Sequence, residues 1–268
     1  MLQSVAMPGS LPEAHQAMAG REGMRIIAGG TAIMPMLNGG TDEFTGLVSL
    51  RKAGLAGFSV KDNVAAIGAA TALSLLEDEE ALAFLRPALD AIASPTIRNM
   101  ATVGGNLLVK QPYGDFAVCL IALGATATIS SAAGDRIEPV EQTVKGIKPG
   151  EIVTQVSFSL PASGSFKFVK AGRKALNAAA IVTVAAVVGL KDRTVASCRI
   201  ALGGVARHAV RAKAVEAALL GKPFDRAHVE AAARAASADI DPFDDSYASA
   251  WYRARVTPVH IRRALLGE

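Results

Sequence analysis

The chain has 268 residues, of which 51% are hydrophobic and 19% charged, so it can build a sizeable core and global disorder is excluded. No run of about 18 uninterrupted apolar residues occurs, so no membrane span is expected. The 28 basic and 24 acidic residues leave a net charge of +4, which is weak support for nucleic-acid binding. The densest basic stretch, residues 253–263, is interpreted as a solvated or subunit-facing helix, with a nucleic-acid patch as the alternative.

The cysteine content indicates a reducing compartment. Cys119 and Cys198 are the only cysteines, lie far apart and form no C-x-x-C motif. This excludes a sequence-local iron–sulfur or zinc site and gives no disulfide framework. The N-terminus lacks the pattern of a secretory signal. We therefore expect a cytoplasmic protein.

The first part of the chain predicts short strands and helices in alternation. Ser10 and Glu13 have the spacing of a capping box and predict a helix through about residue 19. The elements expected after it are strands at 25–27, 47–50 and 64–67, helices at 32–37, 81–93 and 115–123, and a hairpin of strands at 125–131 and 137–140. We expect Ser94-Pro95 to end the helix over 81–93, and Asp115 to cap the helix that it begins.

Turn-forming residues at 161–164 mark the predicted domain boundary, because they separate two apolar runs. The predicted domains are residues 1–163, with lobes of about 1–55 and 56–163, and residues 164–268. In the second domain we expect strands at 166–171, 181–190 and 195–202, then helices at 211–220, 227–236 and 246–266. Pro258 should kink or split the last helix. The fold class is therefore α+β: a nucleotide-binding domain, then a small sheet backed by helices.

Two glycine-paired turns, about seventy residues apart, carry the strongest functional signal. They are Ala28-Gly29-Gly30-Thr31-Ala32 and Thr102-Val103-Gly104-Gly105-Asn106. Residues without a Cβ let backbone N–H groups approach a bulky anion, so two such turns beside strands indicate loops that clamp a pyrophosphate. Thr31, Thr102, Asn106 and Asp115 add donors and acceptors for the diphosphate and for sugar hydroxyls.

A basic segment, residues 170–177, begins the second domain. A cation such as Lys170 or Arg173 near the polar edge of a flavin would stabilise its anionic reduced form. The alternative is an exposed charged turn.

Other familiar sites are not supported. The sequence contains no G-x-G-x-x-G, P-loop, H-E-x-x-H or G-x-S-x-G motif, and its four histidines are scattered. The acidic stretch 239–245 departs from a calcium loop, because Asp244 and Ala250 stand where that loop needs Gly and Glu. We interpret these acids as structural, capping the last helix.

The order A-G-G-T, T-V-G-G-N…P-x-x-D and K-x-x-R-K-A-L resembles the FAD-binding subunit of molybdenum hydroxylases, the group of the carbon monoxide dehydrogenase medium subunit and the xanthine dehydrogenase flavin domain. The resemblance continues through residues 201–206, 210–212, 217–222, 239–242 and 252–265, so it covers nearly the whole chain.

The resemblance implies a two-lobed FAD-binding domain of the vanillyl-alcohol-oxidase type, followed by a small antiparallel sheet with a helical bundle. It implies non-covalent FAD, with the pyrophosphate held by the two turns, Asp115 on FAD hydroxyls, and Ile152 and Lys170 near the ring. The residues that it assigns to FAD are Ala28, Gly29, Gly30, Thr31, Ala32, Ile33, Thr102, Gly104, Gly105, Asn106, Asp115, Ile152 and Lys170.

The same resemblance implies partners. A large subunit would carry the molybdenum cofactor and the substrate chemistry, and a small subunit two [2Fe-2S] clusters, in a dimer of heterotrimers. Electrons would pass from those clusters through FAD to an external acceptor. No catalytic residue and no metal ligand is assigned to this chain.

Three departures from the family pattern bear on this interpretation. Ala32 stands where many relatives have Asp or Ser, and Tyr113 is bulkier than is usual there. Ala178 replaces the aromatic residue that covers the flavin in the carbon monoxide dehydrogenase type. A flavin-free binding or assembly protein on the same fold is therefore kept as the alternative. A stand-alone flavin oxidase is disfavoured, because no substrate-side acid–base pair is evident.

Overall fold

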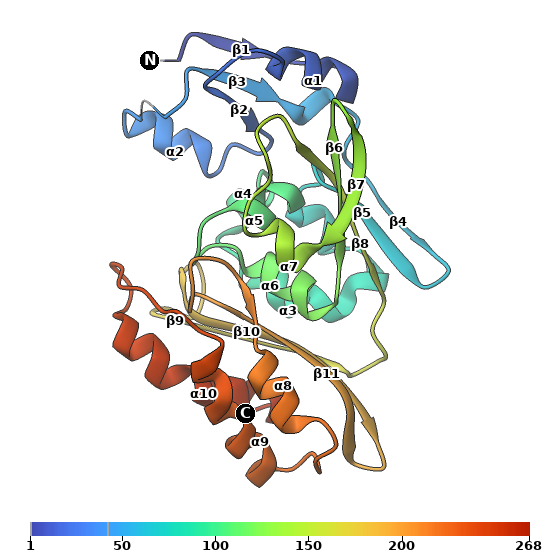
Figure 1. The fold of residues 1–268 in the computed structure, drawn as a ribbon, viewed down its shortest axis with the longest axis vertical. Helices are drawn as coiled ribbons and strands as arrows, with labels where there is room; N and C mark the ends of the chain where they lie inside the picture. The colour runs from blue at the N-terminus through green and yellow to red at the C-terminus, as the bar shows by residue number, and fades with distance from the viewer. Residues whose placement is uncertain (1, 42) are drawn as a thin grey trace.

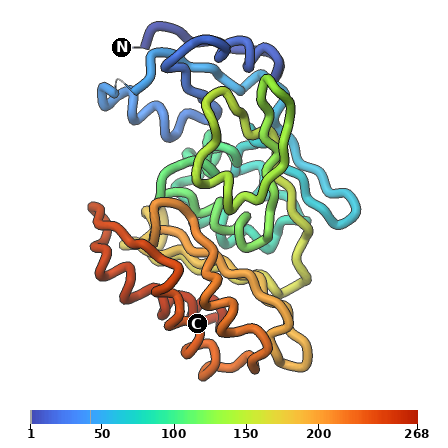
Figure 2. Tube along the Cα trace, in the orientation of Figure 1, coloured from blue at the N-terminus to red at the C-terminus, as the bar shows by residue number. Residues whose placement is uncertain are grey.

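The computed structural model describes residues 2–41 and 43–268, which form three sheets with helices between and beside them (Figure 1). The chain runs from one end of the molecule to the other. The N-terminal sheet lies at one end, the second sheet in the middle, and the third sheet with the last helices at the opposite end (Figure 2). The predicted α+β class is confirmed.

The first sheet is parallel, with the strand order β1-β3-β2. Its strands are β1 Ser4–Ala6, β2 Met24–Ile27 and β3 Gly46–Ser49, and its helices are α1 Leu11–Met18 and α2 Ile33–Asn38. The Ser10 hydroxyl accepts the Glu13 N–H and caps α1, as predicted. The Glu13 carboxylate accepts the N–H of Gly9 rather than that of Ser10, so only half of the capping box forms.

The second sheet is antiparallel, with the order β4-β5-β8-β6-β7. Its strands are β4 Phe58–Lys61, β5 Val64–Gly68, β6 Thr126–Ser131, β7 Gly134–Pro139 and β8 Ile152–Ser159. The helices of this middle part are α3 Arg86–Asp90, α4 Pro95–Arg98, α5 Val103–Leu108, α6 Asp115–Ala122 and α7 Val140–Thr143, with 3-10 turns at Leu50–Lys52, Leu73–Leu76 and Glu80–Leu85. The predicted hairpin is β6–β7.

The single helix predicted over 81–93 is wrong. A 3-10 helix, Glu80–Leu85, is followed by the separate α3, with Pro87 in its first turn. Proline lacks an N–H and is favoured in the first turn of a helix, where that N–H would have no partner, so a new helix begins there. Ser94 does not simply end a helix: its hydroxyl accepts the Ile97 N–H and caps α4.

The third sheet is antiparallel, with the order β12-β11-β10-β9. Its strands are β9 Phe166–Gly172, β10 Ala180–Lys191, β11 Thr194–Gly203 and β12 Val210–Arg211. The helices are α8 Lys213–Leu219, α9 Arg226–Ala233 and α10 Ala250–Leu266, with a 3-10 turn at Arg234–Ala238. Arg211 pairs with β11 and does not begin a helix. Pro258 is predicted to kink or split the last helix; α10 continues through Pro258, so it is not split.

Apolar side chains form three clusters. The largest lies between the second sheet and α6 and includes Ala185 and Ala201 from one face of the third sheet. The opposite face of that sheet packs on α8, α9 and α10. A small cluster joins the first sheet to Ile152 of β8. Both faces of the C-terminal sheet are therefore covered. One face packs on the middle part of the molecule and the other on the C-terminal helices.

Across residues 2–41 and 43–268, no helix is both long enough and apolar enough to cross a membrane.

Candidate functional site

The first glycine-paired turn lies between the end of β2 and α2. Gly30 has a φ of +77°, a conformation that glycine adopts without strain, and its carbonyl accepts the Met34 N–H at 2.9 Å. No other described residue accepts a hydrogen bond from the N–H groups of residues 29–33. Since all five residues are partly exposed or exposed, this turn presents a row of free donors.

The two turns meet at Gly29. A Cβ on Gly29 would lie 1.7 Å from the carbonyl oxygen of Met100 and 2.5 Å from its carbonyl carbon. Met100 and Ala101 directly precede Thr102, the first residue of the second turn. Backbone therefore packs on backbone at this point, and only glycine permits the contact. The structure brings together two segments that the sequence separates widely.

The second turn is the beginning of α5, and its donors are already used. The Gly104 N–H donates to the Ala69 carbonyl at 2.8 Å, and the Gly105 N–H donates to the Thr102 hydroxyl, which caps α5. The Asn106 N–H bonds the Thr102 carbonyl. The glycines of the second turn therefore leave room for a ligand to come close to the backbone, but the N–H groups free to bind it belong to the first turn.

Asn106 fixes the connection between α5 and α6. Its Oδ1 accepts the Phe116 N–H at 3.0 Å, and its Nδ2 lies 3.5 Å from the Tyr113 carbonyl oxygen. The side chain is buried. A buried amide with two backbone partners makes the second turn and the loop after it one rigid unit.

Asp115 does not cap α6, because the N-cap position is Gly114 and no side chain bonds there. Its carboxylate instead accepts from Lys170 Nζ at 2.7 Å and from the Thr183 hydroxyl. Lys170 also donates to the Ala91 carbonyl at 2.8 Å. Only 3% of the Asp115 side chain and 9% of the Lys170 side chain are exposed.

The buried environment of Asp115 disfavours the charged form of its carboxyl group. Burial raises the pKa of Asp115 above its ordinary value, and the pairing with Lys170 opposes that shift without cancelling it. Two predicted site residues are thus joined as an ion pair between the middle of the molecule and β9. Sequence reasoning missed Thr183, although it is a single hydroxyl inside the apolar run 178–190.

Ile152 is the first residue of β8 and is fully buried. It packs with Val48 and Leu50 of the first lobe. The structure therefore places Ile152 where β8 meets the first sheet. Arg173, which directly follows β9, donates to the Ser246 carbonyl at 3.4 Å and is exposed.

Comparison with known proteins decides the family. The family model described as "FAD binding domain in molybdopterin dehydrogenase" matches residues 2–162, and "CO dehydrogenase flavoprotein C-terminal domain" matches residues 166–267. The chain belongs to the FAD-binding medium subunits of the molybdenum hydroxylases.

Its relatives resemble this flavin subunit over nearly their full length. The 6-hydroxypseudooxynicotine dehydrogenase complex subunit alpha of Paenarthrobacter nicotinovorans is 31% identical over 92% of this chain and 87% of that protein. The carbon monoxide dehydrogenase medium chain of Afipia carboxidovorans is 29% identical over 91% and 88%. A solved chain of the reconstituted CO dehydrogenase from Oligotropha carboxidovorans superposes with a TM-score of 0.93, at 28% identity, over 99% of this chain and 96% of that one.

The acidic stretch of the flavin subunit serves the backbone around it. Asp239 accepts the Ala214 N–H, Asp244 the Ala250 N–H, and Asp245 the N–H groups of Tyr247 and Ala248. Three of these acids are therefore structural, but only Asp244 bonds an N–H of α10, whose N-cap is Ser249; Asp239 bonds at the start of α8 and Asp245 in the loop before α10. Within the described ranges, no group of three potential ligands that could hold a metal ion occurs.

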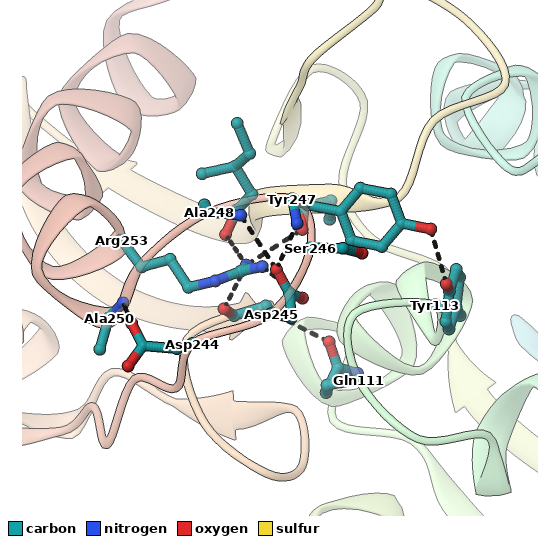
Figure 3. A network of polar contacts seen from close by, with 12 residues as sticks. Gln111, Tyr113, Asp244, Asp245, Ser246, Tyr247, Ala248, Ala250 and Arg253 are labelled. Carbon is teal, nitrogen blue, oxygen red and sulfur yellow. Dashed lines mark hydrogen bonds and ion pairs between the residues drawn. The ribbon is translucent and has the colours of Figure 1, made fainter.

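Arg253 of α10 is the centre of this network (Figure 3). Its side chain is fully buried, and Nη1 donates to the carbonyls of Ala180, Ile181 and Gly204 at 3.1, 2.7 and 2.8 Å. Nη2 pairs with Asp245 at 2.7 Å. Sequence reasoning treated Arg253 as part of a basic surface. Its four-residue spacing from Thr257 and Ile261, both buried, is the signal that could have placed it inside.

The Asp245 pairing predicts a pH dependence. Burial by itself raises the pKa of Asp245, but the N–H groups of Ala248 and Tyr247 and the Arg253 guanidinium outweigh it, so the pKa lies below its ordinary value. A carboxyl whose pKa is lower in the folded than in the unfolded protein stabilises the fold at pH values above its unfolded pKa of about 3.9. This stabilisation is lost as the pH falls through the folded pKa. We expect wild type to be more stable than Asp245→Asn at about pH 7, and this difference to shrink at acid pH. Urea unfolding at several pH values measures it; a difference independent of pH would contradict the assignment.

Proposed function

We propose that the chain is the FAD-binding electron-transfer subunit of a molybdenum-containing hydroxylase or dehydrogenase. The observation that supports this most directly is the contact of the first glycine turn, with its free N–H groups, against the residues that begin the second turn. FAD bound there would supply one- and two-electron redox chemistry. The chain by itself is not expected to hydroxylate a substrate.

The proposed roles follow from which backbone N–H groups in each segment have no acceptor among the residues that the structure describes. The N–H groups of residues 29–33 would donate to the diphosphate, and Gly104 and Gly105 would let it come close to the start of α5. Lys170 keeps a positive charge beside Asp115 at the junction of α6 and β9. The residues that we assign to the flavin site are Ala28, Gly29, Gly30, Thr31, Ala32, Ile33, Thr102, Gly104, Gly105, Asn106, Asp115, Ile152 and Lys170.

We further propose the assembly. Relatives include proteins named as medium chains of carbon monoxide dehydrogenase and of glyceraldehyde dehydrogenase, names that imply other chains in those proteins. The partners proposed here are a large subunit with the molybdenum cofactor and a small subunit with [2Fe-2S] clusters, in a cytoplasmic dimer of heterotrimers. Residues 1–163 and 164–268 are the proposed domains. FAD would be held non-covalently, since neither glycine turn contains His or Cys.

The test is flavin binding. The purified chain, alone and in the complex that co-purifies with it, should show flavin absorption bands that heat or acid releases as free FAD. The variant Gly29→Asp/Gly105→Asp should lose the flavin, because a carboxylate would repel the diphosphate. Absence of flavin from wild type in both preparations, even after FAD is added, would overturn the proposal and favour a flavin-free assembly protein.

A further inference from the structure

The loop between α5 and α6, residues 109–114, connects the second glycine turn to the C-terminal part of the chain. The Gly204 N–H donates to Gln111 Oε1 at 2.7 Å, and the Ala180 N–H donates to the Pro112 carbonyl at 3.3 Å. The hydroxyls of Tyr113 and Tyr247 are 2.9 Å apart. Three successive residues of one short loop therefore hold three different segments of the C-terminal part.

Of these three contacts, the one between the two tyrosines is the most exposed to solvent. The two rings meet edge to face, with centroids 6.3 Å apart and planes at 90°. The hydrogen bond to Tyr247, with burial and the nearby Asp245, raises the pKa of Tyr113 to about 12. Tyr113 is protonated at neutral pH, and either hydroxyl of the pair can donate to the other.

The backbone of Tyr247 is held by Asp245, which pairs with Arg253 (Figure 3). The Asp245 carboxylate accepts the Tyr247 N–H at 2.8 Å and the Ala248 N–H at 2.9 Å, and it pairs with Arg253. Arg253 is itself fixed by the carbonyls at the start of β10 and by Gly204. A buried guanidinium with four partners leaves this loop little freedom.

Tyr113 also reaches the second glycine turn through its backbone. Its carbonyl faces Asn106 Nδ2, and Asn106 Oδ1 accepts the Phe116 N–H. Asn106 directly follows Gly105. A continuous series of contacts thus runs from α10 through Asp245, Tyr247 and Tyr113 to the second glycine turn, which directly follows the residues that Gly29 packs on.

We propose that the Tyr113–Tyr247 pair is a latch by which the C-terminal part, anchored at Arg253, positions the second glycine turn for FAD. The inference rests on the proposed function and extends it. Tyr113, Tyr247 and Arg253 are positioning residues, since they act on the site through Asn106. The flavin site is then completed by both parts of the chain, and its affinity depends on a contact between them.

The test uses Tyr113→Phe, Tyr247→Phe and the double variant in the full chain. Each single change removes one hydroxyl and keeps the ring, so we expect FAD to bind about three- to tenfold more weakly, the worth of one hydrogen bond. Because the hydroxyls act through each other, the double variant should bind no more weakly than either single variant. Titration of flavin fluorescence gives the dissociation constants, and visible circular dichroism reports any change around the bound flavin.

Tyr252→Phe is the matched control. Tyr252 is 43% exposed against 49% for Tyr113, and its hydroxyl has no partner among the described residues, so FAD affinity should not change. A latch that affected only folding would lower the urea midpoint and leave the dissociation constant and the dichroism unaltered. That result, or additive losses in the double variant, overturns the latch while the proposed function stands. A wild-type chain without FAD under any condition overturns both.

Discussion

Gly29→Ala is expected to weaken FAD binding about five- to a hundredfold. The new Cβ would lie 1.7 Å from the Met100 carbonyl oxygen, far inside contact distance. That oxygen belongs to the backbone and cannot rotate away as a side chain can, so the first lobe must move from the second turn. Overpacking of this kind costs about 1–3 kcal/mol, and about 1.4 kcal/mol is a factor of ten in affinity. Equilibrium titration with FAD measures the loss.

Gly9→Ala controls for the general effect of an added methyl group. Gly9 lies in the same lobe, and a Cβ there would be 3.6 Å from the Glu13 carboxylate, an ordinary contact. Its dissociation constant for FAD should equal that of wild type. If Gly29→Ala also bound FAD as wild type does, the close packing of the two turns would not be what forms the site.

Lys170→Met is expected to lower the free energy of unfolding by about 3–5 kcal/mol. It leaves the Asp115 carboxylate, 3% exposed, without its cation, and a buried charge without a partner costs that amount. Lys170 lies on β9 and Asp115 at the start of α6, so the loss falls at the junction of the C-terminal sheet with the middle of the molecule. Urea unfolding measures it, and total stabilities of about 5–15 kcal/mol make the effect large.

Two further variants distinguish the cost of leaving the buried Asp115 charge unpaired from the cost of losing an ion pair as such. Lys170→Met combined with Asp115→Asn removes both charges, so it should cost less than Lys170→Met alone. Glu80→Gln breaks the ion pair to Arg86, in which the Glu80 side chain is 88% exposed, and should cost under about 1 kcal/mol. A Lys170→Met loss as small as that of Glu80→Gln would show that the Asp115 carboxylate is not the charge at stake.

Elements with strong local signals were predicted well from the sequence. The strand predicted at 25–27 corresponds to β2, the hairpin at 125–140 to β6–β7, and the three long strands of the C-terminal sheet to β9, β10 and β11. The elements missed are short or depend on a distant partner. β1 has three residues and β12 two, and each is a strand only because β3 or β11 lies beside it. A short stretch has too little periodicity of its own to reveal such pairing.

At the site, the two glycine turns could be found from the sequence. Which of their backbone N–H groups are already hydrogen-bonded within the protein could not. Gly-Gly beside a hydroxyl residue predicts close backbone approach, and Gly29 against Met100 is such a contact. That Thr102 caps α5, and so occupies the Gly105 N–H, depends on the helix that forms there. Asp115 was assigned to a cap because it begins a helix, but a charged partner on a strand 55 residues later takes its carboxylate.

The sequence by itself determined the family, the order of the elements and the two glycine turns, because those are carried by residue types at fixed local spacing. The tertiary structure decided which groups face each other: Gly29 on Met100, Asp115 on Lys170 and Tyr113 on Tyr247. Such contacts depend on how the three sheets pack, and packing sums many weak interactions between residues distant in the chain. For the same reason Arg253, one of several basic residues in its stretch of the sequence, proved to be fully buried.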